Sequence, residues 1–345
     1  SMFFMYFCEK FDNHFTIPIY FRTIQKKSMD RKNTFLTLCA PLQGFTEAPF
    51  RHFHAEIYGD GIQPVTYIMP FVRIEKGNLR PKDLRELTSP LNQNQTVIPQ
   101  IIFRDEKEFC LLTNAIRDAG YKNVDLNLGC PFTPQVKKGR GAGLIANPSV
   151  LNNVRRMMED ANDMTYSIKM RLGVKHPEEW REIADIINTM PLSHLTLHPR
   201  TAVQQYSGAI YFDEFAEFKQ RIIHPVIYNG DITAPSQIND IVSQFPDIAG
   251  VMIGRGLLMR PSLIIEWKTG QEWPAEQRRS YLLRLHDAIF NHFVNTLTGG
   301  DAQILTKIKP FWEYFGIEFD RRAIKKISKA TNMSGYRTAV GLLTP

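Results

Sequence analysis

The chain has 345 residues, of which 43% are hydrophobic and 22% are charged, and its formal net charge is +7. This length corresponds to about two domains at roughly 150 residues each. The hydrophobic content argues against disordered and collagen-like proteins. No stretch approaches the ~18 consecutive apolar residues that a membrane-spanning helix needs.

Residues 1–33 differ in composition from the rest of the chain. They hold six basic and three acidic residues together with several aromatic residues. Glu9, Lys10 and Asp12 interrupt the apolar core that a signal peptide requires. We therefore expect 1–33 to be an extension outside the main fold, with Met29 as the natural start.

From Thr34 onward, short β-branched runs alternate with helical patterns. Eight strands alternating with helices predict an α/β fold of the (β/α)8 TIM-barrel type over 34–265. A doubly wound sheet would normally place a GxGxxG turn after its first strand, and this chain has none there. The predicted strands are 35–40, 65–69, 97–102, 123–128, 166–170, 194–198, 225–229 and 250–254, and the clearest helices are 105–119, 148–160, 178–190 and 235–244.

After about residue 270 only helical patterns remain, at 275–296, 302–315 and 320–332. The barrel region 34–270 has 25 basic and 25 acidic residues, whereas 271–345 has 11 basic and seven acidic residues. We expect a small all-helical domain at 270–342. Its last helix carries a basic face, which either is solvated or binds a polyanion such as RNA. That face holds Arg321, Arg322, Lys325, Lys326 and Lys329.

The cysteines bear on the cellular compartment. The four cysteines form no CxxC pair and no zinc signature; they are Cys8, Cys39, Cys110 and Cys130. Four cysteines cannot form enough disulfide bonds to stabilise a chain of this length. This usage predicts a reducing, cytoplasmic compartment and no structural metal.

Polar residues stand at seven of the eight predicted strand ends, which is where a TIM barrel places its active site. The glycine-rich turns at Gly230 and Gly254 expose backbone N–H groups that can hold a phosphate, and Arg255 adds positive charge. Lys169 and Gln100 are expected inside the barrel mouth. A lysine near the pyrimidine edge of a flavin stabilises negative charge on the reduced ring, so the pattern predicts a phosphorylated cofactor.

Cys130 lies in a Gly-Cys-Pro turn directly after the fourth predicted strand. A buried cysteine is often inert, but a thiol in the barrel mouth can act as a nucleophile or a proton donor. His198 ends the sixth strand, where a structural role competes with a contact to phosphate or ring. Lys137, Lys138 and Arg140 follow Cys130 and suit an anionic macromolecular substrate, although they could simply be solvated.

Together these segments resemble the flavin-dependent tRNA-dihydrouridine synthases over about residues 36–340. The segments around Phe71-Val-Arg73, Tyr206, Lys307-Ile-Lys309 and Tyr314 are most similar to the bacterial C-type branch. The family motifs are Ala40-Pro41-Leu42, Asp125-Leu-Asn-Leu-Gly-Cys-Pro131, Gly141-Ala-Gly-Leu144, Lys169-Met-Arg-Leu-Gly173, His198-Pro-Arg-Thr201, Asn229-Gly-Asp231 and Met252-Ile-Gly-Arg-Gly256.

The resemblance implies a monomeric enzyme that holds FMN, takes electrons from NADPH and reduces the C5=C6 bond of a uridine in the D-loop of tRNA, with position 16 as the candidate. It implies that Cys130 protonates C5, that Asn127 contacts the target uridine, and that the helices at 270–342 bind tRNA. The residues implied to bind FMN are Pro41, Leu42, Gln43, Gln100, Lys169, His198, Asn229, Gly230, Asp231, Gly254 and Arg255. Those implied to contact tRNA are Arg73, Asn127, Arg200, Tyr206, Lys307 and Tyr314.

Some positions depart from the family pattern. Met69-Pro70 stands where relatives usually have a Thr-Glu pair, Pro199 replaces a common glycine, and Ser207 stands where the C-type often has arginine. These departures concern the target nucleotide and the orientation of tRNA. Two alternatives stay open: an FMN barrel oxidoreductase acting on a small pyrimidine such as dihydroorotate, and a non-catalytic RNA-binding protein. The first alternative does not account for the basic helical tail.

Overall fold

The computed structural model describes residues 35–59, 64–161 and 163–344. The chain divides into one unit ending at Phe35 and a second unit from Leu36 onward, which contains the strands and helices of the fold. The interpretation of residues 1–33 as an extension lies outside the described residues. No helix within the described ranges is both long and apolar enough to cross a membrane.

Among the described residues, nine parallel strands form one sheet in the order β5-β2-β1-β11-β10-β9-β8-β7-β6. The two end strands, β5 and β6, are consecutive in the chain and are separated only by Pro99, which has no N–H to donate to a ladder. They therefore act as one strand, pairing with β2 on one side and β7 on the other, and the eight strand positions close into a barrel. The strands are β1 Leu36–Cys39, β2 Thr66–Ile68, β5 Val97–Ile98, β6 Gln100–Ile101, β7 Asn123–Leu128, β8 Thr165–Gly173, β9 Leu192–Thr201, β10 Val226–Tyr228 and β11 Gly250–Ile253.

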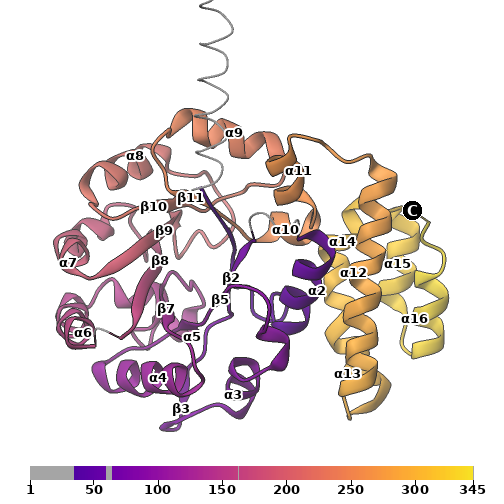
Figure 1. Cartoon of the computed structure of the whole chain (residues 1–345), viewed down its shortest axis with the longest axis horizontal. Helices are drawn as coiled ribbons and strands as arrows, with labels where there is room; N and C mark the ends of the chain where they lie inside the picture. Colours follow the sequence, from indigo (N-terminus) through magenta and orange to yellow (C-terminus); the bar gives the residue numbers. More distant parts are fainter. Residues whose placement is uncertain (1–34, 60–63, 162, 345) are drawn as a thin grey trace, which may run out of the picture. The chain divides into compact units, whose positions relative to one another are not determined.

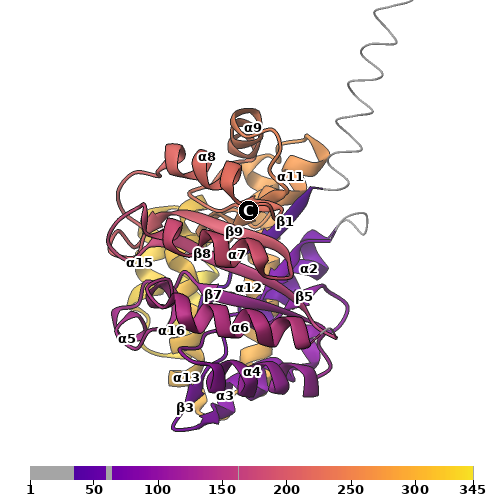
Figure 2. The same ribbon diagram turned by 90° about the vertical axis from the view of Figure 1, so that its left-hand side faces the viewer.

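Helices cover the outside of this barrel (Figure 1). Two views agree that α4, α6 and α7 lie side by side across the outer face of the strands (Figure 2). α4 begins where the Asp105 side chain accepts a hydrogen bond from the Glu108 N–H, and α6 and α9 begin at prolines. The barrel helices are α2 Ala48–Tyr58, α3 Pro81–Leu87, α4 Glu106–Asp118, α5 Thr133–Val136, α6 Pro148–Asp160, α7 Ala184–Thr189, α8 Phe212–Arg221, α9 Pro235–Gln244, α10 Arg255–Met259 and α11 Leu263–Thr269. A separate hairpin, β3 Ile74–Glu75 and β4 Asn78–Leu79, follows β2.

One part of the barrel interior is apolar and another part is polar. A cluster of buried side chains that includes Leu38, Ile68 and Met252 fills the apolar part, and burying each such residue contributes about 1.5–3 kcal/mol. Asp125 and Ser167, on β7 and β8, are also fully or almost fully buried. Polar groups this deep need hydrogen-bond partners, and the network that supplies them underlies the candidate site.

In the described part of the chain, five α-helices follow the barrel and gather at one side, next to α2 (Figure 1). They contact the barrel through Phe45 and Phe50, whose rings lie 5.5 and 6.3 Å from that of Phe311. The Tyr336 hydroxyl, bonded to His286 Nε2 at 2.7 Å and Trp312 Nε1 at 2.9 Å, ties the helices to one another. The helices are α12 Ala275–Thr296, α13 Gly300–Ile308, α14 Trp312–Phe315, α15 Arg321–Lys329 and α16 Met333–Val340.

Candidate active site

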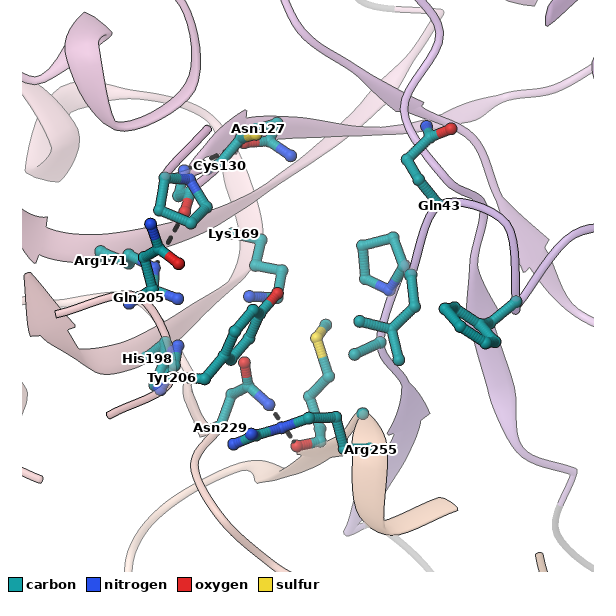
Figure 3. A pocket seen from close by; sticks show the side chains of 18 of the residues that line it. Gln43, Asn127, Cys130, Lys169, Arg171, His198, Gln205, Tyr206, Asn229 and Arg255 are labelled. Atoms are coloured by element: carbon teal, nitrogen blue, oxygen red, sulfur yellow. Dashed lines mark hydrogen bonds between the residues drawn. The ribbon is translucent and has the colours of Figure 1, made fainter. Parts of the chain in front are cut away.

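A cavity of about 1140 Å³ opens at the carboxyl ends of the strands. Figure 3 shows Lys169 and Tyr206 pointing into it, with Cys130 and Asn127 on one side and Asn229 and Arg255 on the other. Fifteen of the 18 residues predicted from sequence line this cavity: Pro41, Leu42, Gln43, Arg73, Asn127, Cys130, Lys169, His198, Tyr206, Asn229, Gly230, Asp231, Gly254, Arg255 and Tyr314.

The other three predicted residues are not among those that line the cavity. Gln100 is fully buried and donates to Asp125. Arg200 is also buried and forms an ion pair with Asp231. Lys307 of α13 lies 3.0 Å from a carboxylate oxygen of Glu47, in the loop before α2. Their assignments to cofactor or tRNA stay predictions.

Cys130 is held in a turn fixed by its backbone. The Asn127 Oδ1 accepts from the Gly129 N–H at 3.0 Å and the Cys130 N–H at 2.8 Å. From β8, the Arg171 Nε donates to the Gly129 carbonyl at 3.0 Å. Gly141 packs so closely that an added Cβ there would lie 2.7 Å from the Cys130 Cβ. The Cys130 backbone is therefore held in one place at the cavity wall.

The environment of Cys130 keeps the thiol protonated. Desolvation raises its pKa above the ordinary value, while a backbone hydrogen bond from Phe132 and the nearby charges of Arg171, Lys169 and Arg73 act in the opposite direction. Since desolvation dominates, the group is an acid with a proton to give at neutral pH, and the surrounding cations stabilise the thiolate left afterwards.

Lys169 faces the cavity from β8. Desolvation, with the charge of Arg171 as a second cause, lowers its pKa to about 8, so its ammonium group remains mostly charged at neutral pH. Asp125 lies behind it on the neighbouring strand, with its pKa raised by burial to about 6. In the β7–β8 register Lys169 lies opposite Asn127, two positions from Asp125. The opposite charges of Lys169 and Asp125 partly offset the cost of burying both.

A second group of residues lies at the ends of β9 to β11. Arg200 and Arg255 both pair with Asp231, which holds the pKa of that carboxyl below its usual range. Burial, then the charges of Arg171 and Lys169, lower the pKa of His198 well below its normal value, so the ring is neutral. Its Nε2 lies 3.3 Å from Arg200 Nη1; since arginine only donates, Nε2 accepts and Nδ1 carries the proton.

Tyr206 covers part of the cavity mouth. Its ring lies between two guanidinium groups, with Arg255 at 4.6 Å and Arg171 at 5.5 Å from the ring centroid. These contacts hold an otherwise exposed aromatic side chain in place. Arg171 also bonds the carbonyls of Gly129 and Thr201, a positioning role that the sequence analysis missed although strand alternation places it on the same face as Lys169.

The cavity suits an anionic aromatic cofactor. Among the described residues that line it, Asp231 is the only carboxylate, and two arginines neutralise it. Arg73, Lys169 and Arg171 leave an excess of positive charge. Gly230, where an added Cβ would lie 2.9 Å from the Tyr228 hydroxyl, and Gly254 both line the cavity. These features fit a phosphorylated flavin, and with the barrel they define a TIM-barrel oxidoreductase.

The comparisons with known proteins name the family. The model for the family described as "Dihydrouridine synthase (Dus)" matches residues 38–315, most of the chain, so the protein belongs to the dihydrouridine synthase family. The family predicted from the motifs is thereby confirmed. The chain is 26% identical to tRNA-dihydrouridine synthase B of Pseudomonas putida, over 70% of this chain and 71% of the relative. It is also 26% identical to a probable tRNA-dihydrouridine synthase of Staphylococcus epidermidis, over 74% and 78%.

Two solved structures are similar at low sequence identity. A 2-naphthoyl-CoA reductase complex matches with a TM-score of 0.49 and 12% identity over 70% of this chain, which spans 50% of that chain. The old yellow enzyme from Trypanosoma cruzi matches with a TM-score of 0.48 and 10% identity, over 71% of this chain and 91% of that chain.

Proposed function

We propose that this protein is an FMN-dependent tRNA-dihydrouridine synthase that uses NADPH to reduce the C5=C6 bond of a uridine in the D-loop. The observation that carries the proposal is the shared cavity of Cys130 and Lys169, a protonated thiol and a buried cation, in a chain of this family. We further propose that it acts in the cytoplasm as a monomer.

The residues around the cavity divide into two groups with separate tasks. When bound, FMN would supply the hydride for C6 of the uracil, with NADPH as the source of electrons. Lys169 would hold the flavin ring and Arg255, with the backbone at Gly230 and Gly254, the phosphate. His198 would donate through Nδ1, because its Nε2 is occupied by Arg200.

Cys130 completes the addition of two hydrogens. Hydride arrival at C6 leaves negative charge on the base, and the thiol gives its proton to C5, so the uracil gains one hydride and one proton and loses nothing. The thiolate that remains is stabilised by Arg171, Lys169 and Arg73, whose charges lower the Cys130 pKa. Proton transfer from solvent then restores the thiol.

A tRNA uridine must leave its stack to reach this cavity, at a cost of a few kcal/mol. Tyr206 and Tyr314 line the cavity from opposite parts of the chain, one after β9 and one on α14, and both offer rings on which a base can stack. Phosphate contacts from the helices at 270–342, and from α15 in particular, would offset the cost of extrusion.

A comparison of electron acceptors tests this function. The flavin of the purified protein is reduced with NADPH without oxygen and then mixed with tRNA from a strain that lacks dihydrouridine, with free uracil, or with orotate. The proposal expects rapid flavin reoxidation by tRNA alone. Faster reoxidation by orotate would favour the small-pyrimidine alternative, and a protein that cannot be reconstituted with FMN would favour the RNA-binding one.

A further inference from the structure

A continuous line of side-chain hydrogen bonds runs from the middle of the barrel to the backbone of Cys130. The Asp125 Oδ2 accepts from Gln100 Nε2 at 2.7 Å, and the Gln100 Oε1 accepts from Asn127 Nδ2 at 2.7 Å. The Asn127 Oδ1 then accepts from the Cys130 N–H at 2.8 Å. Asp125 and Gln100 are fully buried and Asn127 is 6% exposed, so solvent does not compete strongly for these bonds.

The order of donors and acceptors along this line of hydrogen bonds is fixed at both ends. The N–H groups of Gly129 and Cys130 can only donate, so Asn127 must present its oxygen to them and its Nδ2 to Gln100. Gln100 must then present its oxygen to Asn127 and its Nε2 to position 125. An ionised Asp125 can only accept, which is what that end of the line requires.

We propose that Asp125 is a positioning residue for Cys130: as the terminal acceptor it orients the amides of Gln100 and Asn127, and these hold the Gly129–Cys130 turn in the geometry that aims the thiol into the cavity. Asp125 is not among the residues that line the cavity, and its hydrogen bonds reach Cys130 through the two amides. The inference deepens the proposed function, on which its kinetic part rests.

The placement of Asp125 supports a role beyond folding. A buried carboxylate costs stability relative to a well-packed apolar residue, and apolar side chains such as Leu38, Ile68 and Met252 fill another part of the same interior. Burial raises the pKa of Asp125, while the bonds from Ser167 and Gln100 and the charge of Lys169 on the neighbouring strand lower it to a smaller extent. Ser167 Oγ satisfies the second carboxylate oxygen at 2.6 Å, so both oxygens are engaged.

The first test measures alkylation of Cys130 by iodoacetamide, followed peptide by peptide in the protein as purified, with half-buried Cys110 as the internal reference. Asp125→Leu removes the terminal acceptor, and we expect the turn to loosen and Cys130 alkylation to rise about tenfold. Asp125→Asn can still present an oxygen to Gln100 and a donor to Ser167, so alkylation should stay within about threefold of wild type. Unchanged alkylation in a folded Asp125→Leu variant would overturn the proposal.

Exchanging the carboxylate and the amide between positions 125 and 100 tests the proposal even if Asp125→Leu does not fold. Gln100→Glu places two carboxyl groups against each other. At a pH high enough to ionise both, neither can donate, and Cys130 alkylation should rise as much as in Asp125→Leu. The double variant Asp125→Asn, Gln100→Glu restores a donor at position 125 facing an acceptor at position 100, with the same net charge, and should return alkylation toward wild type. A double variant no better than Gln100→Glu alone would contradict the proposal.

Two further measurements separate this inference from the proposed function. Single-turnover tRNA reduction should slow about tenfold in Gln100→Glu and recover in the double variant, while KM for tRNA stays constant. Thr196→Val, which removes a buried hydroxyl without a hydrogen-bond partner among the described residues, is the matched control and should leave both readouts unchanged. If the wild type does not reduce tRNA, the proposed function fails, but the alkylation pattern still tests Asp125.

Discussion

Desolvation and nearby charge set the chemistry of individual residues in the cavity. Burial raises the pKa of the Cys130 thiol and lowers that of the Lys169 ammonium to about 8. At neutral pH the first therefore keeps a proton to donate, while the second keeps most of its positive charge. In water the same two side chains would stabilise developing charge less well, because solvent would reorient around each charge.

Replacing the thiol separates flavin chemistry from base chemistry. Cys130→Ala should keep its flavin and its reduction by NADPH, but tRNA reduction should fall by roughly 10²–10⁴-fold because the proton donor is gone. Absorbance of the flavin and single-turnover reduction of tRNA measure the two properties. Cys110→Ala, in α4, is the control and should behave as wild type; normal tRNA reduction by Cys130→Ala would remove the thiol from the mechanism.

The pKa of Lys169 predicts how the rate of tRNA reduction changes at alkaline pH. Because its folded-state pKa is about 8, lowered from 10.5, the ammonium loses its proton as the pH rises through 8. The charge that we propose for stabilising a reduced flavin would then be lost. We expect the rate of tRNA reduction to decline above this pH in single-turnover measurements. Lys169→Arg should move the decline to higher pH, since a guanidinium stays charged. A rate that is flat well above pH 8 would show that the charge of Lys169 is not needed.

The segment between β7 and α6 folds back on Cys130. Residues of the loop after β7 pack on the turn, and Arg140 pairs with the buried Glu108 of α4 and donates to the Ile74 carbonyl in the hairpin. The loop thus connects the thiol to α4 and β3. Gly141 is the point of closest approach and has a φ of +59°.

Two glycines in this loop form a matched pair. Gly141→Ala adds backbone strain of about 1–2 kcal/mol, and its Cβ would lie 2.7 Å from that of Cys130. Gly139→Ala has a similar φ of +72°, but the nearest atom is 3.4 Å away on the Asn147 side chain. Denaturant unfolding should show a loss for both, larger for Gly141→Ala, and only Gly141→Ala should change the alkylation rate of Cys130. Equal effects of the two changes would mean that the loop does not control the thiol.

At the scale of the whole molecule, charge is distributed unevenly between the barrel and the helices that follow it. The region 34–270 is neutral by residue count, whereas 271–345 has four more basic than acidic residues. The basic side chains on α15 are all exposed, while Ile327 is buried. They are Arg321, Arg322, Lys325, Lys326 and Lys329. This arrangement fits a catalytic barrel joined to a helical part that holds an anionic substrate.

Charge reversal on α15 tests that division. Lys325→Glu with Lys326→Glu should weaken tRNA binding and reduce the slope of log Kd against log salt by about one to two. The matched control reverses two exposed charges on the barrel, Lys122→Glu with Arg156→Glu, and changes the net charge equally. Filter-binding titrations at several salt concentrations measure both. The same salt slope in both double variants would indicate that the basic face of α15 is only solvated and does not bind tRNA.

Much of the fold follows from local sequence, and the site follows only in part. The bounds of α6, α9 and α12 match the predicted ranges 148–160, 235–244 and 275–296, because their apolar periodicity and flanking residues are local signals. In contrast, β8 and β9 run on to Gly173 and Thr201, since the two strands continue to pair with each other through a bulge. No local pattern reveals that partner.

The cavity residues were predictable because strand ends converge in a barrel. The partners of Gln100 and Arg200 were not, since Asn127 and Asp231 lie 27 and 31 positions further along the chain. Sequence alone therefore cannot show that these two side chains bond behind the cavity wall. For the same reason the role of Asp125 emerges only from the hydrogen-bond network.

The most direct test of the account is the dihydrouridine content of tRNA after incubation with the purified protein, FMN and NADPH. Substrate tRNA comes from a strain that lacks dihydrouridine, and nuclease digestion with mass spectrometry locates each modified nucleoside. The account predicts dihydrouridine at a defined D-loop position with the wild type and almost none with Cys130→Ala. A wild-type protein that holds FMN and is reduced by NADPH, yet forms no dihydrouridine, would contradict it.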